Sequence, residues 1–533
     1  MRIAFIPLDD RPCTRDFAGE VARIAGQDLV MPPAGLLGHF LAPGSPEEIA
    51  DWLRAQSMNC DVVVASIDML AYGGLVASRS PEVECGLARQ RLGVLGQVKK
   101  RKPGLVILAF NVLMRISVTA SDAESARHWQ MVHDLSILEH KAAVRLCSSE
   151  ELLEKDRLLS QIPKDVISRY RQARLRNHSI NLFCLDLVRD GVIDFLSFCQ
   201  EDAHVFGPHR AEQDALKRRA SELGLEERVT IYPGTDEAGM LLVARAINEQ
   251  FRLVPRFGFR YVPVGGEKNV AIFEDRPVEE NVRLQVGVAG GYLAAPGTPL
   301  HELDCFCLVN CPQETCSSGP VSPVDASRSQ PGAPSATGST DPRAARAFPS
   351  SAAGSYEAVE SLAERAGDSE LPGPPDESGN DRPQADAHDA FGHVRDAIMA
   401  GVPVGILDIQ NPNGADCMFM SALLGNVDIA ALTAYAAWNT AGNSIGTVVA
   451  TLAIASAALK SGTLQTNIHA LDALCQFLFE RFVDDWLYQS VVRPQVVSYF
   501  GSLPGINLHD LEYPQHYQAV NNMVREKLGV LSH

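Results

Sequence analysis

The sequence lacks the short motifs that most directly reveal an enzyme class. It contains no GxxxxGK[ST] phosphate-binding loop and no HExxH zinc motif, and GVAGGY at residues 287–292 is not a GxGxxG dinucleotide fingerprint. These absences count against P-loop nucleotide hydrolases, zinc metalloproteases and nucleotide-cofactor enzymes. Few histidines lie near the polar motifs described below, so no metal site is predicted, although a divalent cation on the carboxylates stays open.

Basic residues are fewer than acidic ones. The 533 residues include 47 Lys and Arg against 65 Asp and Glu, which gives a net charge of -18. Nucleic acids and anionic membranes select basic patches on a protein surface. The charge balance therefore argues against either of them as the main partner; the polar clusters described below predict a small-molecule substrate.

Long apolar runs are also lacking. The nearest case, residues 447–462, is interrupted by Lys460 and predicts a buried helix instead of a membrane span. The opening MRIAFIPLDDRP lacks the length and cleavage site of a signal peptide. We therefore expect a cytoplasmic protein whose 12 cysteines are reduced thiols. One cysteine cluster matches none of the common zinc spacings: Cys305, Cys307, Cys311 and Cys316.

Strand-like and helix-like segments alternate along the first 300 residues, and the 46% hydrophobic content suffices for a large core. Strands are expected at residues 3–8, 62–67, 105–111, 180–185, 193–199, 229–232, 270–273, 284–288 and 405–409. This alternation predicts an α/β fold with a mostly parallel sheet. We expect a (β/α)8-like barrel with additional C-terminal helices; the alternative is a doubly wound parallel sheet in two domains.

The composition changes after residue 311. Residues 312–388 are rich in Ser, Pro, Gly, Ala and Asp, and such a segment buries too little apolar surface to offset its chain entropy. The sequence therefore predicts an α/β catalytic-type domain over 1–311 and a disordered low-complexity insertion over 312–390. Residues 391–533 are expected to supply the last strand and loop of the α/β domain, followed by a helical region.

Six short polar clusters each follow an apolar run. They are LDDRP (8–12), DMLAYGG (68–74), EDAHVFG (201–207), GTDEAG (234–239), DIQNPNGAD (408–416) and AWNTAGNSIG (437–446). In α/β folds the groups beyond the C-terminal ends of buried parallel strands build the active site. The clusters therefore predict one polar pocket assembled from distant parts of the chain.

Two clusters carry paired acids, which are the candidates for catalysis: Glu201, Asp202, Asp236 and Glu237. Two carboxyl groups in one cavity suit general acid/base catalysis, because burial or crowding raises one pKa and leaves the other group ionised. Glu201 or Asp202 is the expected general acid, and Asp236 or Glu237 the base or nucleophile. The alternative for the second pair is structural, since acids at a helix start cap free amides.

The remaining clusters supply candidate substrate-binding groups. An Asp beside an Arg can hold a hydroxyl, and a Trp ring can stack on a sugar while nearby amides bind its hydroxyls. The structural alternatives are a salt bridge after the first strand, an arginine on a helix surface, and caps at a helix start. The candidates are Asp9, Asp10, Arg11, Asp68, Tyr72, Asn111, Arg115, Asn411, Asp416, Trp438, Asn439 and Asn443.

At these motifs the chain resembles a bacterial family catalogued as domain of unknown function 4127. The resemblance rests on IPLDDRP (6–12), SIDMLAYGGLVASR (66–79), the loop from Asp202 to Gly207, GTDEAGMLLVAR (234–245) and AWNTAGNSIGT (437–447). It spans nearly the whole chain and departs from the shared core at 312–388. The resemblance implies one shared polar site and an association with amino-sugar use, but no assigned reaction.

We expect a hydrolase of glycosidase type that acts on a small sugar or amino-sugar conjugate. Two alternatives stay open. The first is a metal-dependent hydrolase that uses the same carboxylates. The second is a non-catalytic sugar-binding or sensor protein.

Overall fold

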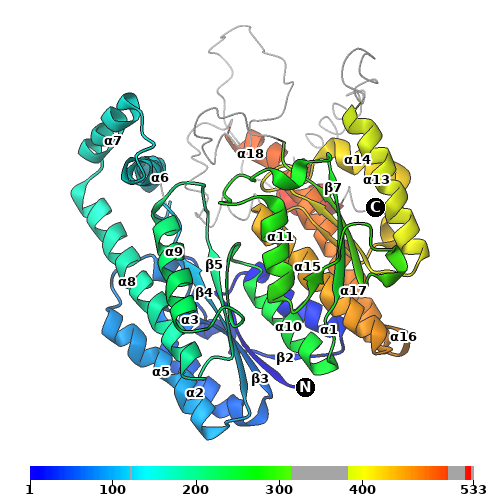
Figure 1. Ribbon diagram of the computed structural model, residues 1–533, viewed down its shortest axis with the longest axis horizontal. Coiled ribbons are helices and arrows are strands. Elements are labelled where there is room, and N and C mark those ends of the chain that lie inside the picture. Colours follow the sequence, from blue (N-terminus) through cyan, green and yellow to red (C-terminus); the bar gives the residue numbers. More distant parts are fainter. Residues whose placement is uncertain (121–122, 314–381, 502–521, 530–533) are drawn as a thin grey trace, which may run out of the picture.

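Two parallel sheets organise the computed structural model, which describes residues 1–120, 123–313, 382–501 and 522–529 (Figure 1). The first sheet has six strands in the order β2-β1-β3-β4-β5-β6. Its strands are β1 (Ile3–Ile6), β2 (Leu29–Val30), β3 (Val62–Ser66), β4 (Val106–Leu113), β5 (Phe195–Gln200) and β6 (Val229–Pro233). The longer ones are nearly continuous apolar runs because helices cover both faces of the sheet.

The second sheet has five parallel strands in the order β11-β10-β9-β7-β8. They are β7 (Arg256–Val262), β8 (Tyr292–Leu293), β9 (Cys305–Asn310), β10 (Val404–Asp408) and β11 (Ala434–Ala436). The pairing of β9 with β10 joins segments on either side of residues 314–381, which lie outside the described residues. The two flanks of this stretch therefore belong to one sheet.

The α/β class is confirmed, but the described strands form two open sheets and no closed barrel is shown. Two sheets are compatible with the alternative prediction of a doubly wound arrangement. Three expected strands are not strands: residues 180–185 lie in α8 (Lys164–Arg189), 284–288 lie in α11 (Val278–Val288), and 270–273 form a loop. A short apolar run on one face of a helix resembles a buried strand, which explains the first two errors.

Helices from both halves of the chain fill the space between the sheets (Figure 1). They are α1 (Pro12–Ile24), α10 (Ala238–Phe251), α11, α15 (Ala441–Lys460) and α17 (Ile468–Arg481). One apolar cluster joins strand side chains of the first sheet, such as Phe5, to those of the second, such as Val309, through this layer. The pocket described below lies beside this shared core.

Other helices cover the outer faces of the sheets. The first sheet is covered by α2 (Pro46–Gln56), α3 (Ile67–Tyr72), α5 (Cys85–Arg101), α8 and α9 (Pro208–Glu222). The second is covered by α13 (Arg382–Met399) and α14 (Cys417–Asn426). The remaining helices are α4 (Leu75–Ser78), α6 (Ala123–Ala143), α7 (Ser149–Gln161), α16 (Thr463–Thr466), the π-helical η6 (Phe482–Val492) and α18 (Arg493–Gly501).

Two sequence expectations concern this helical structure. Helix α13 begins at Arg382, inside the insertion expected at 312–390, and residues 314–381 lie outside the described residues. Helix α15 is long and apolar enough to cross a membrane by length and composition, yet 94% of its apolar window is buried inside the protein. It packs as the core helix that the sequence predicted.

Candidate functional site

A polar pocket of about 520 Å³ lies at the C-terminal edge of the first sheet. Its walls follow β1, β5 and β6, and the start of α15 closes it from the other half of the chain. Five of the six polar clusters contribute lining residues, and DIQNPNGAD does not. Nine of the predicted site residues line it: Asp9, Asp10, Arg11, Arg115, Glu201, Asp202, Asp236, Asn439 and Asn443.

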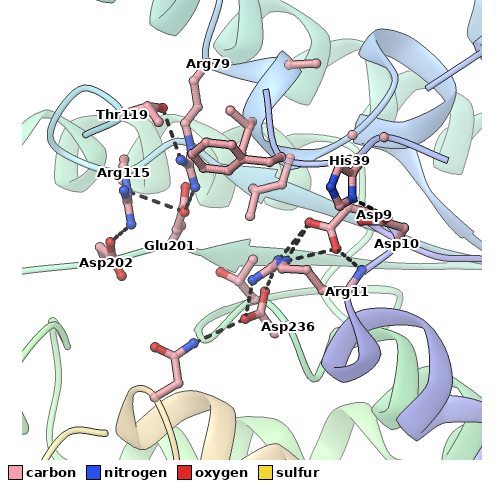
Figure 2. A pocket seen from close by; sticks show the side chains of 18 of the residues that line it. Asp9, Asp10, Arg11, His39, Arg79, Arg115, Thr119, Glu201, Asp202 and Asp236 are labelled. Atoms are coloured by element: carbon pink, nitrogen blue, oxygen red, sulfur yellow. Dashed lines mark hydrogen bonds and ion pairs between the residues drawn. The ribbon is translucent and has the colours of Figure 1, made fainter. Parts of the chain in front are cut away.

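One group of charges is centred on Arg11 (Figure 2). Its guanidinium donates to both Asp236 oxygens at 2.7 and 3.0 Å, and its Nε donates to Asp9 Oδ2 at 2.9 Å. Asp9 and Asp236 are both buried, and Arg11 lies 225 residues before Asp236 in the chain. The pairing is bidentate, which fixes the orientation of the Asp236 carboxylate.

Asn439 and Asn443 complete this side of the pocket. Asn439 Nδ2 donates to Asp236 Oδ2 at 3.2 Å. Asn443 Oδ1 accepts from the backbone amides of Thr235 and Asp236 at 3.1 and 3.2 Å. The start of α15 therefore holds both the backbone and the side chain of Asp236.

A second group of charges lies apart from the first and is formed by Arg79, Arg115, Glu201 and Asp202 (Figure 2). Arg79 contacts Glu201 and donates to Thr119, while Arg115 contacts Asp202 and lies 3.4 Å from Glu201. Burial alone would raise the pKa of Glu201, but the two guanidinium groups outweigh it and the pKa is lowered.

The second oxygen of Glu201 has no hydrogen-bond partner. Glu201 is 93% buried as a side chain, it lines the pocket, and its Oε2 atom is unsatisfied within the described protein. A buried unpaired acceptor is costly unless a ligand or water satisfies it. This oxygen is therefore an unsatisfied acceptor in the wall of the pocket.

His39 and Asp10 form a third polar pair in the pocket wall. His39 Nδ1 lies 2.7 Å from Asp10 Oδ2, and the imidazole is largely exposed (Figure 2). His39 and Thr119 were not predicted as site residues, because both lie in loops away from the six clusters. Arg79 was noted only as part of the motif after Gly73–Gly74, although it contacts Glu201 directly.

Glu237, predicted as a catalytic acid, does not line the pocket. It is fully buried, its Oε2 accepts from the backbone amide of Thr235 at 2.8 Å, and it packs between Gly234 and Gly446. Burial raises its pKa well above the usual value. Glu237 therefore has the structural position given above as the alternative: its carboxyl binds a free backbone amide before α10.

Three other predicted residues lie below the pocket floor instead of lining it. Tyr72 is buried under the guanidinium of Arg176, 4.1 Å from its ring centroid. Asn111 donates to Asn181 at 2.7 Å. Asp68 accepts from the amide of Val112 at 2.8 Å and is almost completely buried. All three side chains pack inside the first half of the chain.

Asp68 should make stability depend on pH. Burial raises its pKa to about 7 from an unfolded value near 4. The folded protein therefore keeps a proton that the unfolded chain releases, and the free energy of unfolding falls as pH rises from about 4 to 7. We expect Asp68→Asn to flatten this fall by about 1 kcal/mol per pH unit, measured by urea unfolding at pH 4.5 to 7.5. An unchanged pH dependence of the free energy of unfolding in Asp68→Asn would contradict the raised pKa of Asp68.

The last three predicted residues belong to the second half of the chain and also lie outside the pocket. Asn411 is exposed on the surface, and Asp416 caps α14 by accepting from Met418 N at 3.0 Å. Trp438 is 8% exposed, contacts Phe17 edge to face and donates to Thr447 at 3.2 Å. Trp438 is therefore a core residue with no face open to a ligand in the pocket.

Residues 442–446 read GNSIG and so match the GxSxG pattern of a serine nucleophile elbow. Ser444 lies inside the first turns of α15, is buried, and exchanges hydrogen bonds with the backbone of Trp438. It does not line the pocket. The GxSxG match therefore reflects the packing at the start of α15 and does not mark a serine nucleophile in the pocket.

A buried polar network, also absent from the predictions, holds the start of α15 in place. Glu274 accepts from the amide of Gly442 at 2.7 Å, and Gln285 donates to the carbonyls of Gly442 and Pro233. Burial raises the pKa of Glu274 to about 8. These contacts fix α15 against the end of β6, and with it the two asparagines that hold Asp236.

Within the described ranges, no group of three or more His, Cys, Asp and Glu side chains is placed to hold a metal ion. Cys305, Cys307 and Cys311 are free and buried in and after β9, and Cys316 lies outside the described residues. The carboxylates of the pocket are mostly engaged by arginines, which compete with a cation for the same oxygens.

Comparison with known proteins identifies the family but no reaction. No curated protein matches the chain. The family model described as "Protein of unknown function (DUF4127)" matches residues 3–531, which is essentially the whole chain. The chain therefore belongs to the DUF4127 family.

Proposed function

We propose that the protein is a hydrolase of glycosidase type that acts on a small sugar or amino-sugar conjugate bound in this pocket. The main support is the unpartnered Oε2 of Glu201, a buried acceptor in the lining. Five acids and three arginines line the same space: Asp9, Asp10, Glu201, Asp202 and Asp236, with Arg11, Arg79 and Arg115. Fixed carboxylate oxygens suit the hydroxyl and amino donors of a sugar.

The two charged groups take different roles in this proposal. Asp236 is the base or nucleophile, because Arg11 and Asn439 fix its carboxylate toward the pocket. Glu201 binds substrate instead of donating a proton, because its lowered pKa keeps it ionised. Asp202 contacts Arg115 and is assigned to substrate binding as well. The proton donor is assigned to His39, because its imidazole lines the pocket and Asp10 orients it through a 2.7 Å contact with Nδ1.

Turnover of a panel of aryl glycosides and aryl amino-glycosides tests the proposal. We expect Asp236→Asn and His39→Gln each to lower kcat/KM by about 100-fold, in line with the loss of a general acid or base. Asp416→Asn is the matched control: this carboxyl was predicted from sequence but caps α14 outside the pocket, and Asn is an equally good cap. Its turnover should equal that of the wild type.

Other outcomes favour the competing functions. Wild-type binding of a sugar that is released unchanged would replace the hydrolase with a sugar-binding or sensor protein. Activity that is lost on chelation and restored by a divalent cation would favour a metal-dependent hydrolase. Unchanged turnover in both Asp236→Asn and His39→Gln would refute the roles given to these residues.

A further inference from the structure

An exposed aromatic side chain stands in the pocket wall at the tip of a tight turn. Residues 39–42 form a two-residue reversal in which His39 and Ala42 exchange backbone hydrogen bonds, both 2.9 Å long. Phe40 and Leu41 occupy its tip and are 46% and 53% exposed. Phe40 lines the pocket and Leu41 does not. Among the described lining residues, Phe40 is the only Phe, Tyr or Trp.

The backbone of Phe40 has an unfavourable conformation for its residue type. Its φ is +47°, in the left-handed region where glycine is preferred and a bulky side chain is rare. Exposure of an aromatic ring to water adds a second cost. Residues that are strained and poorly buried at a pocket wall point to a role in binding, because neither feature stabilises the fold.

The turn is also held firmly to the pocket floor. The Gly44 amide donates to the Gly73 carbonyl at 2.8 Å, and the Asp10 amide donates to the Gly38 carbonyl at 3.1 Å. A Cβ atom at Gly38 would lie 2.3 Å from the Gly73 oxygen, so the two segments touch through their backbones. The ring of Phe40 therefore stands on a preformed support, and little ordering cost remains for a ligand that packs on it.

We propose that Phe40 is the stacking platform of the pocket and packs on the apolar face of a sugar ring. This inference rests on the proposed function and assigns to Phe40 the stacking role predicted for Trp438, whose ring lies in the core. A pyranose presents C–H groups on its faces and hydroxyls around its edge. One aromatic surface beside carboxylate and amide groups matches that distribution, with Asp236 and Glu201 available to the polar edge.

The test measures sugar binding and fold stability together in the full-length protein. The probe is the tightest binder from a panel of free hexoses, hexosamines and their methyl glycosides, titrated by calorimetry. Phe40→Gly removes the ring and relieves the positive φ, so we expect the melting temperature to stay equal or rise while Kd increases at least tenfold. Phe40→Tyr and Phe40→Trp should bind within about threefold of the wild type. In Phe40→Trp the ligand should also change the tryptophan fluorescence.

Leu41→Ala is the control, because it removes an equally exposed apolar side chain from the same turn outside the pocket. Its Kd should be unchanged. Phe40→Gly that binds like the wild type would overturn the stacking role and leave the proposed function standing. Wild-type protein that binds no member of the panel would overturn the proposed function, and the stacking role with it. A Phe40→Tyr variant that loses binding as Phe40→Gly does would also overturn the stacking role.

Discussion

Arg11→Ala is expected to lower the free energy of unfolding by roughly 2–3 kcal/mol and to reduce turnover about 1,000-fold. The substitution leaves Asp9 and Asp236 buried without their shared cation. Breaking a buried ion pair costs about 3–5 kcal/mol, and we take a lower figure because the Arg11 side chain is 42% exposed. Asp236 also loses the bidentate guanidinium contact that orients its carboxylate. Chemical denaturation and kcat/KM on the aryl-glycoside panel measure the two effects.

Arg189 provides a closely matched control. Its side chain is 45% exposed and also bridges two aspartates, Asp186 at 2.9 Å and Asp190 at 2.8 Å. Those partners are well exposed, so water replaces the lost contacts. Arg189→Ala should therefore change stability by less than about 1 kcal/mol and leave turnover unchanged. Equal losses of stability in Arg11→Ala and Arg189→Ala would show that burial of the carboxylate partners does not cause the loss in Arg11→Ala.

Gly442→Ala is expected to destabilise the protein by about 3 kcal/mol and to abolish ligand binding. A Cβ atom at this position would lie 2.6 Å from the Pro233 carbonyl oxygen and 2.9 Å from Gly234 Cα. Both are backbone atoms at the end of β6, so relief requires α15 to move away from the first sheet. Asn439 and Asn443 move with it, and Asp236 loses both of its asparagine contacts.

Gly93→Ala tests the same chemical change without the clash. Gly93 is exposed in the middle of α5, and a Cβ atom there has no neighbour within 4 Å. Alanine is the better helix former, so stability should rise by about 0.5–1 kcal/mol. Thermal unfolding of both variants measures the contrast. A Gly442→Ala variant as stable as the wild type would contradict the close approach of α15 to β6.

Sequence patterns predicted the first sheet better than the second. Strands such as β3 and β5 are buried on both faces and appear as uninterrupted apolar runs that end in polar residues. Strand β7 reads RFGFRYV, with half-buried arginines, and β11 has only three residues, so neither gives that signal. Strand β9 lies before the change in composition and β10 lies after it. No sequence pattern shows that these two strands pair with each other.

For the site, the sequence predicted where the pocket lies but only some of the side chains that reach it. Asp236 and Glu237 are neighbours at the start of a helix, and only the first points into the pocket while the second is buried. The direction in which each of these side chains points depends on tertiary packing, which the periodicity of the sequence does not encode. His39 and Phe40 lie in a turn that does not directly follow a strand, so the strand-end rule could not select them.

The shared helix layer also sets an order for assembly on the ribosome. All strands of the first sheet lie within residues 3–233, but α15, which covers its inner face together with α1 and α10, begins about 200 residues later at Ala441. At typical rates of synthesis this delay lasts roughly 10–40 s. During that interval the nascent chain carries an incompletely covered apolar surface, and the pocket is completed only when residues 439–443 emerge and dock.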